Sequence, residues 1–589
     1  MPVKNARKKI LIDRTIAKMS IEEKAGQCFT YVWNSPLLGP TIVEAVEKLH
    51  CGGLRLAPFN TEGFRAKYYQ YESMLGYKYP GGVTPIMQSW LKEGVLSTVE
   101  PEEYAARLNR LQKMATSRNS GIPLHVAIDM EGDYSHDFPY GRINLFPAVL
   151  GLKASGSTEL TRRVGRAIGK QLSAIGVNLI HSPVLDVLST TKNIEIGIRS
   201  FSDDPAEVAR YGAAYMKGLQ EGGLITTGKH CPGRGACAED AHFVTPTIKL
   251  DRKTMMESEL APYRKLIKQG LDSIMMAHTI YPALDPDEIA SLSPVVIRDV
   301  IRGELGFRGV ITTDAIAMGA VIKKYPLHEA CARAIQAGSD LVLNRLQTEA
   351  RDQGYWETVK WVRDGRIPEE DLNDRIRNIL SKKYDRGLYR TRGQVRAKDA
   401  PKPFRSPANR KLSHEAALKA TIILRNKDRL LPLKKDCRVL VIEQTGPIKY
   451  LGLDTSFHRL SFLEAMYSHS MNVIGFDTEF CATTPEQEGE KSEESLIMSL
   501  LDKVDVVVAT NHFWRIVPEN NSALINKIIA AGKKVVVVTN SPFDASITPR
   551  MKNVILTFSS TPESMRVAAN VLYGTEKPKG KWPLNKFRI

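Results

Sequence analysis

The feature that most constrains the fold is a series of short apolar runs separated by amphipathic helical patterns. Strands that alternate with helices in this way form parallel sheets with the helices packed against them. Seven such units over about 300 residues exceed what a small open sheet needs, so they predict a TIM-type (β/α)8 barrel, with an eighth strand near residues 25–31. The predicted strands are GLRLA (53–57), LHVAID (124–129), VNLIHSPV (177–184), GLITTGKH (223–230), DSIMMAH (272–278), GVITTD (309–314) and DLVLN (340–344).

A second α/β pattern begins near residue 411, after a basic stretch with little periodicity. Residues 386–410 contain three prolines, which is typical of an interdomain linker. After this stretch, CRVLVIE, MNVIGFD, VDVVVATN, KKVVVVTNS and NVILTFS alternate with helical segments, which indicates a smaller doubly wound α/β sandwich. We therefore predict a barrel domain at 1–385, a linker at 386–410 and a sandwich domain at 411–589.

Composition excludes several classes of protein. The chain has 589 residues, of which 43% are hydrophobic and 25% charged, so it is globular and too long for a single core. No apolar stretch is long enough to span a membrane, and the basic N-terminus lacks the apolar run of a secretory signal. Seven scattered cysteines argue against disulfides and fit a reducing compartment. We expect a cytoplasmic protein without a membrane partner, or a secreted one if the chain is a trimmed mature form.

The charge balance and the cysteines give no reason to expect nucleic acid, metal or cofactor. The net charge is +17, but the basic residues are spread along the chain without a nucleic-acid-binding motif, which favours a solvated basic surface. Cys231 and Cys237 lie near His230 and His242, yet their spacing lacks the CxxC pairs of zinc sites. No glycine-rich fingerprint follows the first strand of the second domain, so dinucleotide binding is unsupported.

Four predicted barrel strands end in a residue that can take part in chemistry: Asp129, His230, His278 and Asp314. The carboxyl ends of barrel strands meet at one mouth, and active sites of barrels are built there. One polar strand end can be coincidence, but four in one chain predict a site at this mouth.

The stretch TTGKHCPGRGACAEDAHFVTPTI (226–248) follows one of these strands. It leaves the strand with Lys229 and His230, and its glycines and proline allow a tight, irregular loop. Asp240 and His242 stand two residues apart, so in an extended segment their side chains point the same way and can form a hydrogen bond. A carboxylate fixes the tautomer of an imidazole and raises its basicity, as a general acid requires.

The stretch ELGFRGVITTDAIAMGAV (304–321) places Asp314 at the end of an apolar strand. Small residues that begin a helix follow directly. An aspartate in this position is usually either a helix cap or a catalytic group, and these residues alone leave both interpretations open.

Together, KHCPGRG, DAH and GVITTDAIAM resemble glycoside hydrolase family 3, specifically its β-N-acetylglucosaminidase branch. The likeness runs in order over about residues 15–385, and the linker and small domain resemble those of two-domain members. Further matching pieces are SIEEKAGQ (20–27), AIDMEG (127–132), PVLDV (183–187), GIRSFSDDP (197–205) and MMAHTIYPALDP (275–286).

The resemblance implies a retaining hydrolase that removes terminal non-reducing β-linked N-acetylglucosamine or a related hexosamine, as in cell-wall recycling. Asp314 would form the covalent glycosyl-enzyme, and His242, paired with Asp240, would be the acid/base. The partner would be a small amino-sugar glycoside, such as a cell-wall or chitin fragment. The sugar-binding residues would be Asp129, Arg199, Lys229, His230 and His278.

The sequence departs from the family pattern at three positions near the expected site. Arg234 replaces the second histidine of the loop, Cys231 replaces its phenylalanine, and Asp133 stands where a glycine is common. We expect Arg234 and Asp133 to add charge near the mouth and to affect specificity. The Tyr-rich segment 64–98, with Trp90, either lines an outer sugar subsite by aromatic stacking or forms a self-packed surface insertion.

Three alternatives remain. A histidine donor leaves the site less negative than a glutamate would, so phosphate could replace water and make the protein a phosphorylase. A β-glucosidase or β-xylosidase of the same family usually takes its acid from a glutamate in the second domain, and residues 411–589 show no such motif. A non-catalytic glycan-binding protein is disfavoured because Asp314, Asp240 and His242 are all present.

Overall fold

The computed structural model describes residues 2–33, 38–56, 100–133, 143–193, 195–241, 244–345, 349–444, 461–478, 493–513, 521–543 and 546–587. The predicted aromatic segment 64–98 and the predicted acid His242 lie outside these residues.

Eight parallel strands close into a barrel in the order β1-β10-β9-β6-β5-β4-β3-β2. The seven strands predicted from the sequence are confirmed, and the eighth is β1, which begins at Phe29 in the expected region. The barrel strands are β1 (Phe29–Trp33), β2 (Gly53–Leu56), β3 (His125–Ile128), β4 (Leu179–Ile180), β5 (Ile225–Cys231), β6 (Ser273–Met276), β9 (Val310–Ala315) and β10 (Leu341–Asn344).

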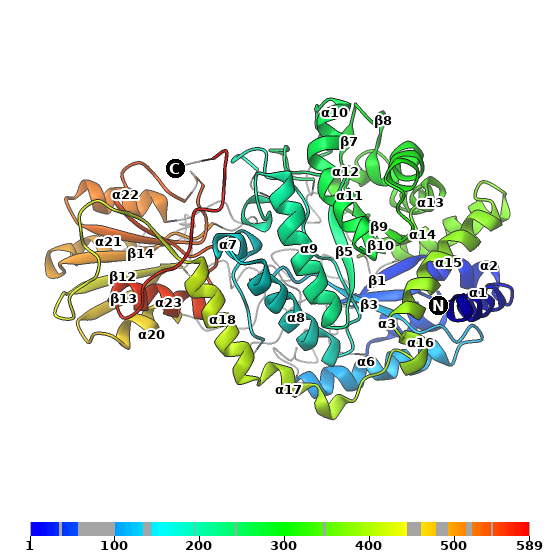
Figure 1. Cartoon of the computed structure of the whole chain (residues 1–589), viewed down its shortest axis with the longest axis horizontal. Helices are drawn as coiled ribbons and strands as arrows, with labels where there is room; N and C mark the ends of the chain where they lie inside the picture. The colour runs from blue at the N-terminus through cyan, green and yellow to red at the C-terminus, as the bar shows by residue number, and fades with distance from the viewer. Residues whose placement is uncertain are drawn as a thin grey trace.

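Helices surround the barrel, and α8 and α9 run side by side along it (Figure 1). Glycines allow this close approach, since a Cβ on Gly218 would lie 2.1 Å from the carbonyl oxygen of Arg162. Ser157 caps α8 by accepting a hydrogen bond from the backbone of Leu160. The surrounding helices are α1 (Pro2–Ile16), α2 (Ile21–Gln27), α3 (Pro40–Glu47), α6 (Pro101–Thr116), α8 (Thr158–Ala174), α9 (Pro205–Glu221), α11 (Ala261–Lys268), η4 (Val295–Glu304), α13 (Leu327–Ala337), α14 (Glu349–Arg363) and α15 (Glu369–Asp385).

Short elements occupy the connections between these strands and helices. Several of them follow the carboxyl ends of barrel strands, where the predicted site residues stand. They are α7 (Val149–Ala154), η1 (Gly197–Arg199), α10 (Arg252–Thr254), η2 (Met255–Glu259), β7 (Ile280–Tyr281), β8 (Asp285–Ile289), η3 (Ala290–Leu292) and α12 (Gly319–Ile322).

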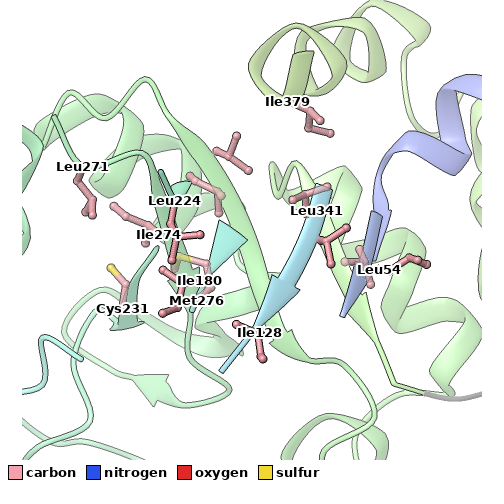
Figure 2. Close-up of a cluster of buried hydrophobic side chains, with 14 of the residues drawn as sticks. Leu54, Ile128, Ile180, Leu224, Cys231, Leu271, Ile274, Met276, Leu341 and Ile379 are labelled. Carbon is pink, nitrogen blue, oxygen red and sulfur yellow. The ribbon is translucent and has the colours of Figure 1, made fainter. Parts of the chain in front are cut away.

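The main core lies between the barrel strands and the surrounding helices, and Figure 2 shows part of it. Strand β3 illustrates the alternation: Val126 and Ile128 belong to this core, whereas Ala127 contacts Leu179 and Ile225 in a separate small cluster. Successive side chains of a strand point to opposite faces. By this alternation Asp129, two residues beyond Ala127, faces the barrel axis at the carboxyl end of β3.

The second sheet has the strand order β11-β16-β15-β14-β12-β13. It is parallel except for β11, which pairs antiparallel with β16. The five predicted strands are confirmed; the sequence analysis did not predict β11, a half-exposed edge strand that follows a helix directly. The strands are β11 (Ile422–Asn426), β12 (Val439–Gln444), β13 (Val473–Thr478), β14 (Val506–Thr510), β15 (Val535–Thr539) and β16 (Asn553–Leu556).

Both faces of this sheet are covered. In β14, Val506 and Val508 face one apolar cluster, and Val507 and Ala509 face another, as the period of two requires. Helices α18 (Pro407–Ala420), α20 (Ser461–Tyr467) and α23 (Pro562–Leu572) supply the first cluster. Helices α21 (Glu493–Ser499) and α22 (Ser522–Ala530), with the short η7 (Leu501–Lys503), supply the second. This arrangement is the α/β sandwich that the sequence predicts.

The barrel and the second sheet contact each other directly. Leu150 and Ala154 of α7 pack with Phe543 and Phe558, which lie beyond the ends of β15 and β16. The chain passes between the two units through α16 (Leu388–Thr391), η5 (Ala397–Asp399), α17 (Pro401–Phe404) and α18. We retain 386–410 as the proposed linker between the proposed domains 1–385 and 411–589.

In the ranges given above, no helix combines the length and the apolar character needed to cross a membrane.

Candidate active site

A network of buried charges occupies the carboxyl ends of β3 and β5. The Nζ of Lys229 lies 2.8 Å from Oδ1 of Asp129 and 2.7 Å from Oε1 of Glu131. Arg55 of β2 forms a second ion pair with Asp129. The side chains of Lys229 and Glu131 are each 4% exposed, whereas that of Asp129 is 24% exposed. Asp129 is therefore the group of this network that is open to a ligand.

The charges of this network keep its carboxylates ionised. Burial opposes the ionisation of Asp129, but the Lys229 ammonium and the Arg55 guanidinium hold the pKa of Asp129 well below its ordinary value. Glu131 behaves in the same way: burial is outweighed by Arg199 and Lys229, which lower its pKa. The ammonium of Lys229 has a raised pKa, because Asp129 and Glu131 outweigh the effect of burial.

Arg199 joins this network from the turn η1. Its Nε donates to Oε2 of Glu131 at 2.7 Å and its Nη2 donates to Oε1 at 2.9 Å, a bidentate pair. Its Nη1 donates to the carbonyl oxygen of Glu195 at 2.8 Å. Glu131 thus holds both predicted cations, Lys229 and Arg199. The sequence prediction of the site did not include Glu131, although an acidic residue two positions after Asp129 was a visible signal.

His230 is oriented by a carboxylate that the sequence prediction also missed. Its Nδ1 lies 2.8 Å from Oδ2 of Asp186, and both side chains are buried. Asp186 also accepts a hydrogen bond of 2.7 Å from the backbone N–H of Arg234. Burial opposes its ionisation, but His230 and the hydrogen bonds lower the pKa of Asp186. An ionised partner places the proton on Nδ1 of His230 and leaves Nε2 for a ligand.

The loop after β5 is folded tightly against the barrel. Gly233 has a φ of +136°, which favours glycine. A Cβ on Gly235 would lie 1.5 Å from the carbonyl oxygen of Val187, so this position admits no side chain. Tyr281 donates to the carbonyl oxygen of Gly233 at 2.8 Å. These contacts set the path of the chain toward Asp240.

Arg234 does not add charge to the mouth, so the expectation from the sequence is wrong at this position. Its side chain is 1% exposed and forms a bidentate ion pair with Glu195, in which Nη1 lies 2.8 Å from Oε1. Burial opposes its charge, but Glu195 raises the pKa of Arg234, and Asp186 and Asp314 act in the same direction. The guanidinium thus stays charged, and the carboxylate of Glu195 balances its charge inside the protein.

The other two departures from the family pattern are also buried. The thiol of Cys231 lies in the apolar core with Leu271 and Ile274 (Figure 2), and Asp133 is 8% exposed. Cys231 and Cys237 are both buried free thiols. Within the described part of the chain, no three His, Cys, Asp or Glu side chains are arranged to hold a metal ion.

Asp314 lies in β9 and is partly exposed. Its Oδ1 accepts a hydrogen bond of 2.7 Å from the backbone N–H of Ala315. The Nε2 of His278 donates to the carbonyl oxygen of Ala315 at 3.1 Å, and its Nδ1 lies 2.7 Å from Oγ of Ser291. Burial lowers the pKa of His278 to about 4, so the ring is neutral. Both ring nitrogens of His278 are therefore engaged, and Nε2 holds the strand end that carries Asp314.

The chain around Asp240 meets this same strand end. The carbonyl oxygen of Ala241 accepts a hydrogen bond of 3.1 Å from the backbone N–H of Ala320. The side chain of Ala241 is buried in a small cluster with Ala315 and Met318. Thr245 donates to the carbonyl oxygen of Ala320 at 2.7 Å and fixes the far side of the loop. Ala241 thus lies in one apolar cluster with Ala315, the residue that follows Asp314.

Comparison with protein families matches both parts of the chain. Residues 81–382 match the family described as "Glycosyl hydrolase family 3 N terminal domain", and residues 421–587 match "Glycosyl hydrolase family 3 C-terminal domain". The chain belongs to glycosyl hydrolase family 3. As a member of this family it is a glycoside hydrolase, and its barrel followed by a sandwich is a two-domain fold that the family's solved structures share.

Relatives in the family are named as beta-N-acetylglucosaminidases or beta-hexosaminidases, and one of them is named as a beta-glucosidase as well. A beta-N-acetylglucosaminidase/beta-glucosidase of Cellulomonas fimi is 25% identical over 510 residues, which are 84% of this chain and 88% of the relative. A beta-hexosaminidase of Nitrosomonas eutropha is 35% identical over 255 residues, 42% of this chain and 72% of the relative. The solved structure of a family 3 beta-N-acetylglucosaminidase from Paenibacillus sp. str. FPU-7 has a TM-score of 0.79 and 26% identity, covering 96% of this chain and 99% of that one.

Proposed function

We propose that this family 3 hydrolase removes terminal non-reducing β-linked N-acetylglucosamine, or a related hexosamine, with retention of configuration. The observation that carries the proposal is the contact between Ala241 and the end of β9. It puts Ala241, whose chain neighbours are Asp240 and His242, in one cluster with Ala315, the residue after Asp314. A proton donor and a nucleophile that act on one bond must lie this close together. The names of the relatives support the amino sugar, with a cell-wall or chitin fragment as the natural source.

In the first proposed step, a carboxylate oxygen of Asp314 attacks the anomeric carbon of the sugar. The bond from that carbon to the leaving oxygen breaks, and His242 gives its proton to that oxygen. In the proposed dyad Asp240 would accept a hydrogen bond from His242 and so favour the charged imidazole. The product is a glycosyl ester on Asp314 and a released alcohol.

In the second step, His242 takes a proton from water as the water oxygen attacks the same carbon. The bond between the carbon and Asp314 breaks, and the sugar leaves with its original configuration. The carboxylate of Asp314 and the protonated imidazole are then restored. No metal or cofactor is part of either step.

The proposed sugar-binding residues divide according to their contacts. Asp129, the exposed carboxylate of the network, would accept hydrogen bonds from hydroxyl groups. Lys229 has three donors and Arg199 has five, and in the described structure two and three of these, respectively, are already engaged by the protein, so donors remain for the sugar.

The two histidines predicted to bind the sugar differ in which ring nitrogens can still contact a ligand. His230 would offer Nε2, because Asp186 holds its Nδ1. His278, with both ring nitrogens engaged, would act on the sugar only through the strand end that it fixes.

A panel of aryl β-glycosides tests the substrate class. We expect release of the aryl group from the N-acetylglucosaminide, with much slower release from the glucoside and the xyloside. The assay is run with and without inorganic phosphate, and free sugar and sugar phosphate are measured separately. Free N-acetylglucosamine in both conditions supports hydrolysis, whereas sugar phosphate as the main product would show a phosphorylase.

Asp314→Asn tests the nucleophile. The variant keeps the shape of the side chain but removes its negative charge, so we expect no measurable turnover with the fold retained by circular dichroism. Asp299→Asn is the matched control, since Asp299 lies exposed on η4, and it should keep wild-type activity. Full activity in Asp314→Asn would refute the assignment.

A further inference from the structure

The C-terminal tail of the second domain returns to the barrel. Beyond α23 the backbone N–H of Lys581 donates to the carbonyl oxygen of Ala154 at 2.8 Å. The tail then runs along the side of the barrel loops, where the C-terminus is marked (Figure 1). Its last described residues meet Asp203, which is fully buried and stands just before α9.

Asp203 accepts hydrogen bonds from successive backbone N–H groups of this tail. Oδ1 accepts from Asn585 at 2.9 Å, and Oδ2 accepts from Lys586 at 2.5 Å and from Phe587 at 3.3 Å. A carboxylate that accepts several backbone N–H groups forms strong, charge-assisted bonds. The barrel residue Asp203 therefore holds a specific backbone conformation of the tail.

Apolar contacts hold the tail in the same place. Nε1 of Trp582 donates to the carbonyl oxygen of Phe587 at 2.8 Å, which closes the tail into a hook. The side chains of Trp582, Leu584 and Phe587 belong to one cluster with Ile198 of the turn η1 and Phe543 of the second domain. The hook thus lies against η1.

The turn η1 is the element that carries Arg199. Gly197 has a φ of +44°, and a Cβ at this position would lie 3.6 Å from the ring of Phe543. After the turn, Ser200 donates to the carbonyl oxygen of Asp186 at 2.7 Å. The backbone N–H of Leu188 donates to the carbonyl oxygen of Ser202 at 3.0 Å. The segment from Gly197 to Asp203 is therefore fixed by the barrel on one side and by the second domain on the other.

We propose that Asp203 and the tail hook, residues 582–587, are positioning elements of the sugar site. They hold η1 so that the guanidinium of Arg199 meets Glu131 beside Lys229. The second domain then contributes to sugar binding indirectly, because it fixes the position of Arg199 in the barrel. None of its own side chains needs to contact the reacting atoms. This inference rests on the proposed function, because it takes Arg199 as a sugar-binding residue.

Steady-state kinetics on the aryl β-N-acetylglucosaminide test the inference. Asp203→Ala removes the acceptor of the tail, and a chain ending at Leu584 removes the donors while keeping Trp582. In both variants we expect KM to rise about 10-fold, with a smaller change in kcat, since small displacements of a positioning group weaken productive binding. Asp203→Asn keeps one acceptor oxygen and should restore part of the loss.

Asp204→Ala is the matched control. Asp204 caps α9 by accepting from the backbone of Ala206 at 2.8 Å, and it accepts from the side-chain amide of Asn585 at 3.3 Å. Its loss therefore lowers stability and removes one side-chain contact of the tail, but it leaves the backbone bonds of the tail to Asp203 in place. A purely structural role for Asp203 predicts equal kinetics for the two variants at a temperature where both are folded. Equal KM values in Asp203→Ala, the shortened chain and the control would overturn the inference.

A double-mutant cycle with Arg199→Ala tests whether Asp203 changes KM through Arg199. If Asp203 acts through Arg199, adding Asp203→Ala to Arg199→Ala changes KM by less than twofold; a full second loss contradicts the inference. Hydrogen exchange gives a readout without substrate, and residues 196–203 should exchange faster in Asp203→Ala than in the control. A wild-type protein that cleaves no aryl glycoside would instead refute the proposed function, whereas unchanged exchange refutes the positioning role alone.

Discussion

Glu131 and Arg199 form a bidentate ion pair, with Nε 2.7 Å from Oε2 and Nη2 2.9 Å from Oε1. Because Oε1 of Glu131 also lies 2.7 Å from Nζ of Lys229, one buried carboxylate sets the position of two cations. One of these cations, Lys229, also pairs with Asp129, the more exposed acid. The relative placement of the proposed sugar-binding groups therefore depends on a residue that the sequence did not single out.

Glu131→Gln should weaken both sugar binding and stability. The amide keeps the size of the side chain but leaves Lys229 and Arg199 without their shared anion. Breaking a buried ion pair costs about 3–5 kcal/mol, and a displaced Arg199 should raise KM about 10-fold. Urea unfolding and aryl-glycoside kinetics measure these effects. Glu494→Gln, at an exposed pair with Lys527, is the control and should change neither by much; a wild-type KM in Glu131→Gln would contradict the proposed network.

Arg234→His, which introduces the residue usual in the family, should destabilise the protein. The change leaves Glu195 buried without its bidentate partner, and removal of one member of a buried pair costs about 3–5 kcal/mol. Glu195→Gln in the same chain should recover part of this loss, as a double-mutant cycle would show.

The exposed pair between Arg438 and Asp505 supplies the comparison for Arg234. Arg438→Ala should lower the free energy of unfolding much less than Arg234→His does, because solvent screens exposed pairs. Similar losses of unfolding free energy in Arg234→His and Arg438→Ala would show that the buried Arg234 pair stabilises the fold no more than an exposed pair does.

Glu259 should make stability fall between weakly acidic and weakly basic pH. Burial, with the nearby charge of Asp186, raises the pKa of Glu259 from 4.5 to about 8. The folded protein then holds a proton that the unfolded chain has lost, so this contribution to stability is present below pH 4.5 and is lost as the pH rises to about 8. Glu259→Gln cannot titrate. The urea midpoint of Glu259→Gln, relative to that of the wild type, should therefore rise between pH 5 and pH 8.5. A difference between the two midpoints that stays constant over this range would refute the prediction.

His414 should stabilise the packing of α18 on α23 at acidic pH. Its Nδ1 lies 2.7 Å from Glu563 and its Nε2 lies 2.8 Å from Glu576. Burial opposes the charge, but these carboxylates raise the pKa of His414 above 6.5. The stabilising contribution is complete below pH 6.5 and is lost as the pH rises through the folded-state pKa. His414→Gln should lower the melting temperature at pH 5.5 more than at pH 8.5; equal losses at both would rule out a charged histidine.

The barrel and the sandwich could be predicted because each strand carries its own pattern. β9 and β14 are short apolar runs next to amphipathic helices. This hydrophobic pattern is local to each segment and can be recognised without knowledge of the tertiary structure. Strand β11 escaped prediction because it is a half-exposed edge strand that directly follows α18. Asp129 and Asp314 could be predicted as strand ends for the same reason, since strand ends follow from strand patterns.

The partners of these residues could not be predicted in this way. Arg199 and Glu131 are 68 residues apart in the chain, and Lys229 and Asp129 are 100 apart. Arginine is usually exposed, but Arg234 in its glycine-rich loop is buried because its side chain pairs with Glu195 beneath that loop. No local period links such pairs, so their charges appear unpaired in the sequence.

The sequence by itself determined the types of the secondary structure elements, the closed parallel barrel and the polar residues at its mouth. These follow from hydrophobic periodicity and from the rule that parallel strands end on one side. Only the tertiary structure decided which charges neutralise one another and that the tail of the second domain reaches Asp203. The physical reason is that ion pairs and backbone contacts between distant segments depend on distances that exist only after the barrel has closed.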